Sequence, residues 1–213
     1  MAGQTCGQAA RVLSKRMRGL LTLLVLALAA TPVAASDLLF DAVATGNKNA
    51  VEQALANGAD VDSRARDQAT PLISAALGDQ FAIAELLLNN GANVMARNSG
   101  GFTPLHAAAY SGSVATAKLL LAKGAVVDDA ANKAGVTPLM VAGEENHVAV
   151  AELLLAKGAD VNHAEIHGYM PITRALWKGN KEIVWLYKQH GATCPPAKSI
   201  GEADHAKCME IHD

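Results

Sequence analysis

The chain has 213 residues, of which 51% are hydrophobic and 18% are charged, and this composition excludes intrinsic disorder as the main state. Aromatic residues make up only 4% while alanine and leucine are abundant, which favours closely packed helices over a β-sandwich. After residue 35 the chain holds 14 basic and 20 acidic side chains, so it lacks the basic face that nucleic-acid binding requires.

Residues 1–35 have the pattern of a secretory signal peptide. Four basic residues precede a twelve-residue apolar run from Gly19 to Ala30, and the small residues Val33-Ala34-Ala35 follow. A transmembrane helix needs about 20 residues, so an uncleaved membrane anchor is the less favoured alternative. We expect cleavage near Ala35, with either Met1 or Met17 as the start, and a mature chain in the periplasm or outside the cell.

Two short motifs recur along the rest of the chain with a period of 33 or 34 residues. Threonine before proline is typical of a helix start, and the first motif, Thr-Pro-Leu or a close variant, begins at Thr70, Thr103, Thr137 and Met170. Glycine is typical of a helix end, and the second motif, Gly-Ala, begins at Gly58, Gly91, Gly124, Gly158 and Gly191. The segments between each glycine and the next threonine are rich in turn-forming residues. Each unit is therefore predicted to be a helix pair and a loop.

The unit that begins Phe102-Thr103-Pro104-Leu105-His106 and ends in Leu119 to Ala125 resembles the consensus of the ankyrin-repeat family along nearly its full length. The resemblance implies an all-α solenoid of stacked antiparallel helix pairs, with β-hairpin-like loops and a concave face that holds another protein. It covers residues 36–193, in units near 37–68, 69–101, 102–135, 136–168 and 169–193. Between neighbouring units we expect three buried leucines whose replacement by alanine costs about 2–5 kcal/mol each, namely Leu87, Leu120 and Leu154.

The first and last units depart from the repeat pattern as the ends of an array would. The first unit has no threonine motif, and we expect Asp37 to act as the N-cap of its first helix. The second helix of the last unit, Lys181 to Gln189, carries Trp185, Tyr187 and Lys188 where other units have leucines. We expect these three side chains to face solvent and this unit to close the array.

The sequence gives little support for an enzyme. It contains no G-x-S-x-G, H-E-x-x-H, P-loop or dinucleotide-binding motif, so we expect no catalytic residues and no cofactor. His106 belongs to the repeat motif and is interpreted as a structural hydrogen-bonding residue rather than a general base. Glu144 and Glu145 are adjacent on one helix, where neighbouring side chains do not face each other, so they are not interpreted as an acid/base pair.

The tail, residues 194–213, contains Cys194, Cys208, His205 and His212. Their spacing fits a zinc site poorly, because ligands normally come as a close cysteine pair and a close histidine pair. An exported chain would retain two cysteines, and an oxidising compartment would pair them. We favour a Cys194–Cys208 disulfide that stabilises the last unit by about 3 kcal/mol, with free thiols or a metal site as alternatives.

Aligning the units places the family's variable contact positions just before the glycine of each helical turn and in the loop ahead of each threonine. Four of the eight aromatic side chains fall on these positions, and exposed aromatics are enriched at interface hot spots. The alternative is that these aromatic side chains pack between neighbouring units and stabilise the stack. The predicted partner-binding residues are Arg66, Asp67, Phe102, Tyr110, Ser111, Lys133, Glu144, Glu145, Ile166, His167, Tyr169, Trp177 and Lys178.

Two functions remain open. The resemblance implies a non-catalytic module that binds a partner protein through the concave face, as a monomer, with no nucleic acid or membrane span. Some exported bacterial members of the family are linked with oxidative-stress protection through a neighbouring catalase, so support of an envelope stress-defence enzyme is a further implication. The alternative is a metal- or thiol-dependent redox protein whose site lies in the tail around Cys194 and Cys208.

Overall fold

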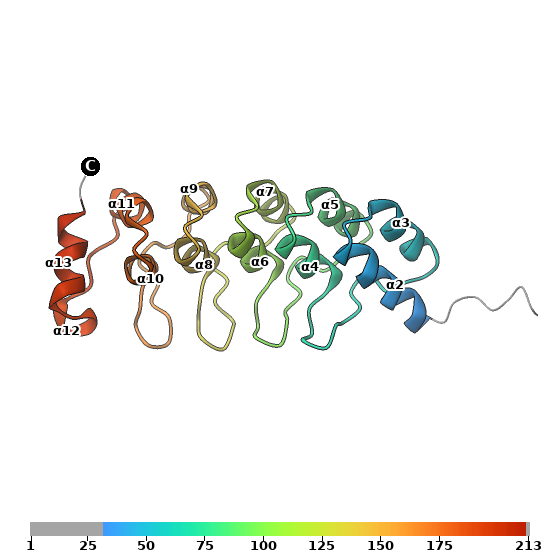
Figure 1. Cartoon of the computed structure of the whole chain (residues 1–213), viewed down its shortest axis with the longest axis horizontal. Helices are drawn as coiled ribbons and strands as arrows, with labels where there is room; N and C mark the ends of the chain where they lie inside the picture. The colour runs from blue at the N-terminus through green and yellow to red at the C-terminus, as the bar shows by residue number, and fades with distance from the viewer. Residues whose placement is uncertain (1–31, 212–213) are drawn as a thin grey trace, which may run out of the picture.

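The computed structural model describes residues 32–211, within which the chain forms twelve α-helices and no strand. Figure 1 shows the helix pairs side by side along one axis, with long loops on one side and a short helical tail at the C-terminal end. The pairs are α2 (Pro32–Ala44) with α3 (Lys48–Ala56), α4 (Pro71–Leu77) with α5 (Phe81–Asn89), α6 (Pro104–Ser111) with α7 (Val114–Ala122), α8 (Pro138–Glu144) with α9 (Val148–Ala156), and α10 (Pro171–Lys178) with α11 (Lys181–Gln189); the tail holds α12 (Ala197–Ile200) and α13 (Glu202–Glu210).

These elements confirm the predicted all-α solenoid of five helix pairs. Most of the predicted signal sequence, residues 1–31, lies outside the described residues. The expected cleavage point after Ala35 falls within α2, where Ala35 is buried. None of the helices within residues 32–211 has the length and hydropathy that crossing a membrane requires.

The first helix of repeats two to five begins at the proline of the motif, as predicted. Thr70 Oγ1 accepts a hydrogen bond from the Ile73 N–H at 3.3 Å, and Thr137 makes the equivalent bond. Where Met170 replaces threonine, Thr173 Oγ1 accepts from the Met170 N–H instead, at 3.4 Å. The helix start therefore survives the substitution, because another side chain satisfies a backbone donor that would otherwise be unpaired.

The core runs through the whole stack between the two layers of helices. Leu87, Leu120 and Leu154 are fully buried, which confirms their expected place between neighbouring repeats. Small alanines fill much of the remaining space, and Ala75, Ala108 and others have no exposed surface at all. This composition allows the helices to approach closely, in keeping with the low aromatic content.

Side chains that precede the second helices join each repeat to the one before it. Gln80 Nε2 donates to the Val43 carbonyl at 2.8 Å, and Asn180 Nδ2 donates to the Gly143 carbonyl at 2.8 Å. His147 Nε2 bonds to the carbonyl of Tyr110 at 2.9 Å. These bonds satisfy carbonyls at the C-terminal ends of the first helices, which have no partner within their own helix.

The loops close as hairpin-like turns, and neighbouring loops are joined through their backbones. In the loop before α6 the Asn98 N–H donates to the Phe102 carbonyl at 3.1 Å, and the Ser99 N–H donates to the Asp67 carbonyl of the preceding loop at 2.7 Å. A buried carboxylate strengthens the next joint, because the Arg97 guanidinium meets both oxygens of Asp129 at 2.5 and 2.8 Å. The loops therefore form one continuous wall along the array.

The predicted role of Asp37 in the starting repeat is wrong for this chain. Helix α2 begins at Pro32, five positions earlier, so Asp37 lies inside the helix and is exposed. Apolar and small residues precede it without a helix breaker after Pro32, and the helix continues through them.

The prediction that the last helix pair faces solvent through Trp185, Tyr187 and Lys188 is also wrong. Tyr187 has no exposed surface, and its hydroxyl donates to the Leu139 carbonyl at 2.7 Å, one repeat away. Trp185 and Lys188 are half-buried. The tail packs against this end of the array, while Lys181 and Glu182 of α11 stay exposed.

Candidate functional site

The concave side of the array, between the first helices and the loops, contains a groove of about 510 Å³. Its floor, the side formed by α6, includes Ala107 and His106, and Phe102 lines it from the loop that precedes α6. We call this the concave groove; its further lining side chains are Ile73, Leu77, Tyr110, Val141, Glu144, Glu145 and Arg174. Most of these are apolar, so the groove can receive an apolar side chain with charged groups at one end.

One repeat position supplies large side chains that the stack does not bury. It lies at or next to the last residue of each first helix, and its occupants are Leu77, Tyr110, Glu144 and Trp177. Leu77 is 51% exposed, Tyr110 is 53% exposed and Trp177 is 48% exposed. We call these four residues the rim row. Exposed large apolar residues at the same position in three repeats are a surface feature rather than core packing.

His106 forms part of the groove floor, but its hydrogen bonds are already used. Its Nδ1 accepts from the Thr103 N–H at 3.2 Å, so Nε2 carries the proton and donates to the Val136 carbonyl at 2.9 Å. Burial lowers the pKa of His106, and the Val136 carbonyl opposes this shift. The interpretation of His106 as a structural residue agrees with this geometry.

Glu144 joins two repeats through an ion-pair cluster at the end of the groove. Its carboxylate meets Arg174 Nη1 at 2.9 Å and Lys178 Nζ at 3.3 Å, both on α10. Glu145 is exposed and forms no ion pair among the described residues. Two of the predicted contact residues, Glu144 and Lys178, therefore bind each other in the free chain.

A second, smaller hollow of about 300 Å³ lies beyond this cluster, beside Tyr169 and Trp177. The two rings meet edge to face with centroids 4.7 Å apart. His167 stacks on Tyr169 at 6.2 Å and its Nδ1 lies 3.1 Å from a carboxylate oxygen of the buried Glu165. Tyr169 is half-buried, so it both supports Trp177 and contributes to the surface.

The remaining predicted contacts lie along the loop wall or behind the rim row. Arg66, Asp67, Lys133 and Ile166 are exposed, and Ile166 reaches 66%. Ser111 is half-buried and donates its hydroxyl to the Ala76 carbonyl at 2.8 Å, which joins it to the preceding repeat. The structure thus brings Phe102, Tyr110 and the two glutamates together in the groove and leaves the loop residues on a separate strip.

The rim-row residue of the second repeat escaped the sequence analysis. Contact positions were aligned on the glycine of each helical turn, but in this repeat Asp79 takes the left-handed conformation, with φ of 53°. The glycine there, Gly78, stands one position earlier and directly follows Leu77, so Leu77 also fits the rule that gave Tyr110 and Ser111, although it was not among the predicted contacts. Its spacing of seven residues from Thr70, the same as that of Tyr110 from Thr103, was the available signal.

The tail contains the predicted bridge, since Cys194 and Cys208 are joined as a disulfide with their Cα atoms 5.9 Å apart. His205 Nδ1 bonds to the Pro195 carbonyl at 2.7 Å, and His212 lies outside the described residues. No group of three or more His, Cys, Asp or Glu side chains within residues 32–211 is arranged to hold a metal ion.

Comparison with protein families agrees with the architecture. The family model for ankyrin repeats (3 copies) matches residues 39–131 and 126–195, which together span most of the chain. The chain belongs to the ankyrin-repeat family. A search of curated proteins found no match to this ankyrin-repeat chain. Ankyrin-repeat domains are generally non-catalytic protein-binding modules. Membership of this family supports a protein–protein interaction module here.

Proposed function

We propose that the chain is an exported ankyrin-repeat module that holds a partner protein in its concave groove. The observation that carries this proposal is the rim row, where Leu77, Tyr110 and Trp177 expose large apolar surface that no neighbouring repeat uses. Residues of this kind give most of the binding energy when a partner excludes water from them. The ion pairs around Glu144 then contribute to specificity more than to affinity.

The groove favours a partner that presents an apolar side chain. Phe102 and Val141 both line the 510 Å³ space, which is large enough for one or two side chains. The hydrogen-bonding groups of His106 are occupied, so the floor offers contact area rather than a free donor. The exposed carboxylate of Glu145 at the rim adds a negative charge beside this apolar floor.

The test is a double substitution, Tyr110→Ala with Trp177→Ala, compared with the wild type in quantitative partner capture. We expect capture to weaken at least tenfold, about 1.4 kcal/mol, while the melting temperature changes by only a few degrees. Phe81→Ala with Met209→Ala is the matched control, because both residues are exposed but lie on α5 and α13. The control should leave capture unchanged.

Two results would contradict the proposed surface. A large loss of stability with normal capture by the folded fraction would mean that the rings of Tyr110 and Trp177 support the stack. An equal loss of capture in the control pair would mean that binding does not depend on the concave side. A photo-crosslinking amino acid at position 110 provides an independent check, since it should attach to the partner while one at position 81 should not.

We also propose that the module acts in the periplasm or outside the cell, after cleavage near Ala35. The support is the basic and apolar pattern of residues 1–35, together with the disulfide of the tail, which an oxidising compartment favours. Mass spectrometry of the exported protein should give a chain that starts at or near Ser36. A role in support of an envelope stress-defence enzyme stays a prediction, tested by crosslinking from position 110 followed by identification of the attached protein.

A further inference from the structure

The two tail helices bury few side chains for their length. The four residues of α12 bury none, and the nine residues of α13 bury only Cys208. By contrast, α6 buries six of its eight residues. Burial of apolar surface is the main favourable contribution to packing. Packing by the side chains of the tail therefore contributes little to holding it against the array.

Few other contacts join the tail to the last repeat. Lys188 Nζ donates to the carbonyls of Cys208 and Ile211 at 3.0 and 2.8 Å, and Ile200 and Ile211 are partly buried against the core. The bond between His205 and the Pro195 carbonyl links α13 to the residue after Cys194, close to where the disulfide links it. Cys194 directly follows the last repeat and packs against the core, so the disulfide is the covalent connection that holds α13 beside the array.

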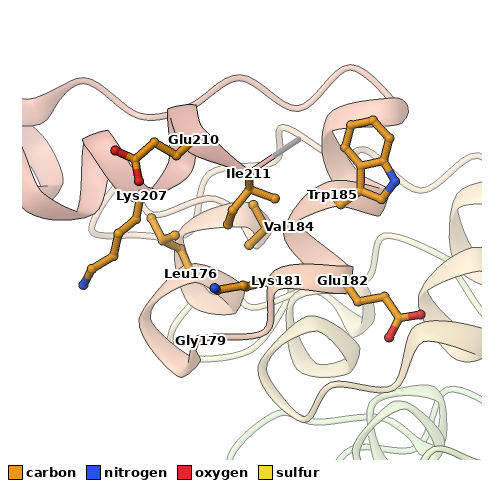
Figure 2. Close-up of a pocket in the computed structure, with 9 residues that line it drawn as sticks. All are labelled: Leu176, Gly179, Lys181, Glu182, Val184, Trp185, Lys207, Glu210 and Ile211. Carbon is orange, nitrogen blue, oxygen red and sulfur yellow. The ribbon is translucent and has the colours of Figure 1, made fainter. Parts of the chain in front are cut away.

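The contact beneath α13 is also incomplete. A cavity of about 440 Å³ lies between α13 and the last helix pair. Figure 2 shows Ile211 above Val184 and Leu176, with Trp185 to one side and Lys207 and Glu210 on α13. Removing the tail would open this cavity and expose the apolar end of the array around Val184.

We propose that the Cys194–Cys208 disulfide is a redox-controlled latch, which a dithiol reductant opens to release the tail and uncover the end of the fifth repeat. The two sulfurs differ in access, because Cys194 is half-buried and Cys208 has no exposed surface. Cys194 is therefore the sulfur that a reductant reaches first.

The exchange is balanced as a two-electron transfer from the reductant. One thiolate of the reductant attacks Cys194 Sγ, the Cys194–Cys208 bond breaks, and Cys208 leaves as a thiolate that takes up the proton the reductant gave up. The second thiol of the reductant then loses its proton and attacks the mixed disulfide. This step forms the disulfide of the reductant and releases Cys194 as a thiol. The ammonium of Lys188, bonded to the Cys208 carbonyl, favours the leaving thiolate by its charge.

Hydrogen exchange of the full chain, with and without the dithiol dithiothreitol, tests the latch. Reduction should raise the exchange rates of the amides in 197–211 at least tenfold, while those of α4 to α9 stay the same. In a Trp177→Phe background the emission of Trp185 should shift to longer wavelength as the end of the array is uncovered. Cys194→Ser should show the released state without reductant, and dithiothreitol should cause no further change in it.

Three outcomes would overturn the latch. Unchanged protection of 197–211 after complete reduction would mean that packing alone holds the tail. Loss of protection throughout α4 to α9 would mean that the disulfide maintains the whole fold. A bridge that dithiothreitol cannot reduce while the array stays folded would mean that Cys194 is not accessible in the native state.

Discussion

His106 stabilises two repeats through one buried ring. It accepts from the Thr103 backbone in its own repeat and donates to Val136 at the start of the next. Both bonds require the neutral ring with its proton on Nε2, because a proton on Nδ1 would face the Thr103 N–H. Arg97 and Asp129 form an ion pair nearby and shift the pKa of His106 in opposite directions, since the charge of Asp129 raises it and that of Arg97 lowers it.

The stability of the array should therefore fall as the pH drops below about 6.5, the ordinary pKa of histidine. The pKa of His106 is lowered by burial in the folded state, so the unfolded chain binds its proton more readily. The contribution of neutral His106 to the free energy of unfolding is fully present above that pH. Below it, the free energy of unfolding falls by at most about 1.4 kcal/mol per pH unit until the folded-state pKa is reached. Urea unfolding at pH 7.5 and 5.0 should show this loss, and His106→Gln should show less of it.

The carboxyl groups should affect the stability of the array only at lower pH. Burial raises the pKa of Asp129, but the hydrogen bond and charge of Arg97 outweigh it and leave the pKa lowered. Its contribution is therefore complete above the ordinary range near 4 and is lost only as the pH falls through the folded-state value. A loss between pH 6.5 and 5.0 that is equal in wild type and His106→Gln would contradict the assignment to His106.

Gly143 is the second residue whose replacement should have an unusual effect. Glycine inside a helix normally costs about 1 kcal/mol relative to alanine, so helix propensity alone predicts that Gly143→Ala is stabilising. A Cβ at this position would lie 2.5 Å from Tyr187 Oη and 3.0 Å from Cε2. Because Tyr187 is fully buried and bonded to Leu139, we expect a loss of about 1–3 kcal/mol in urea unfolding.

A matched glycine provides the control for this clash. At Gly78 a Cβ would lie 3.2 Å from Gln80 Nε2 and 3.4 Å from the Ser74 carbonyl oxygen, which are longer contacts than those at Gly143. Gly78→Ala should therefore change the stability by less than Gly143→Ala. The combination of Gly143→Ala with Tyr187→Phe should recover part of the loss if the hydroxyl is the clashing group. Equal effects at the two glycines would point to backbone conformation as the cause.

At the scale of helices, the sequence predicted most of the fold because each boundary has a local cause. The predicted second helix of the last repeat, Lys181 to Gln189, matches α11 at both ends. The prolines after Thr70, Thr103 and Thr137 start their helices, since capping depends on residues that lie within one turn. Local chemistry does not report on distant contacts, which is why the burial of Tyr187 against Leu139 was missed.

The candidate site was predictable only in part for the same reason. The repeat position of Tyr110 and Trp177 could be read from the motif spacing, and both are exposed in the structure. The pairing of Glu144 with Arg174 depends on how two repeats are packed, so the sequence pattern gave no sign of it. The tail helices likewise have weak apolar patterns, because a covalent bond supplies much of what packing usually supplies.

Two neighbouring leucines of α7 test the packing between helices. Leu120 has no exposed surface and lies in the core between repeats, whereas Leu121 is half-buried. We expect Leu120→Ala to cost about 2–5 kcal/mol in urea unfolding, because it removes apolar contacts and leaves a cavity. Leu121→Ala, with the same helix propensity change, should cost less than half as much. Similar losses would contradict the assignment of the core to one face of the helix.

At the scale of the molecule, the two ends of the array differ in how they are closed. Within residues 32–211 the first repeat has a neighbour on one side only, and its second helix, α3, buries just Val51 and Ala54. Leu38 on α2 is 56% exposed beside a hollow of about 300 Å³. The other end is covered by the tail, as Figure 1 shows. In a repeat protein, where stability is a sum of units and interfaces, the uncovered end is the weaker one.

The array should therefore open from its N-terminal end. In native-state hydrogen exchange of the oxidised chain, we expect the amides of α2 and α3 to exchange at least tenfold faster than those of α6 to α9, with α10 and α11 in between. Leu38→Glu should leave this order unchanged, because Leu38 contributes little to the interface, whereas Leu39→Ala should accelerate exchange in α2 and α3 selectively, since Leu39 is fully buried. Rates should be compared at two pH values to establish that exchange follows the opening equilibrium. Equal protection from α2 to α11 would mean that the five repeats open as a single cooperative unit, and the additive description of the array would then fail.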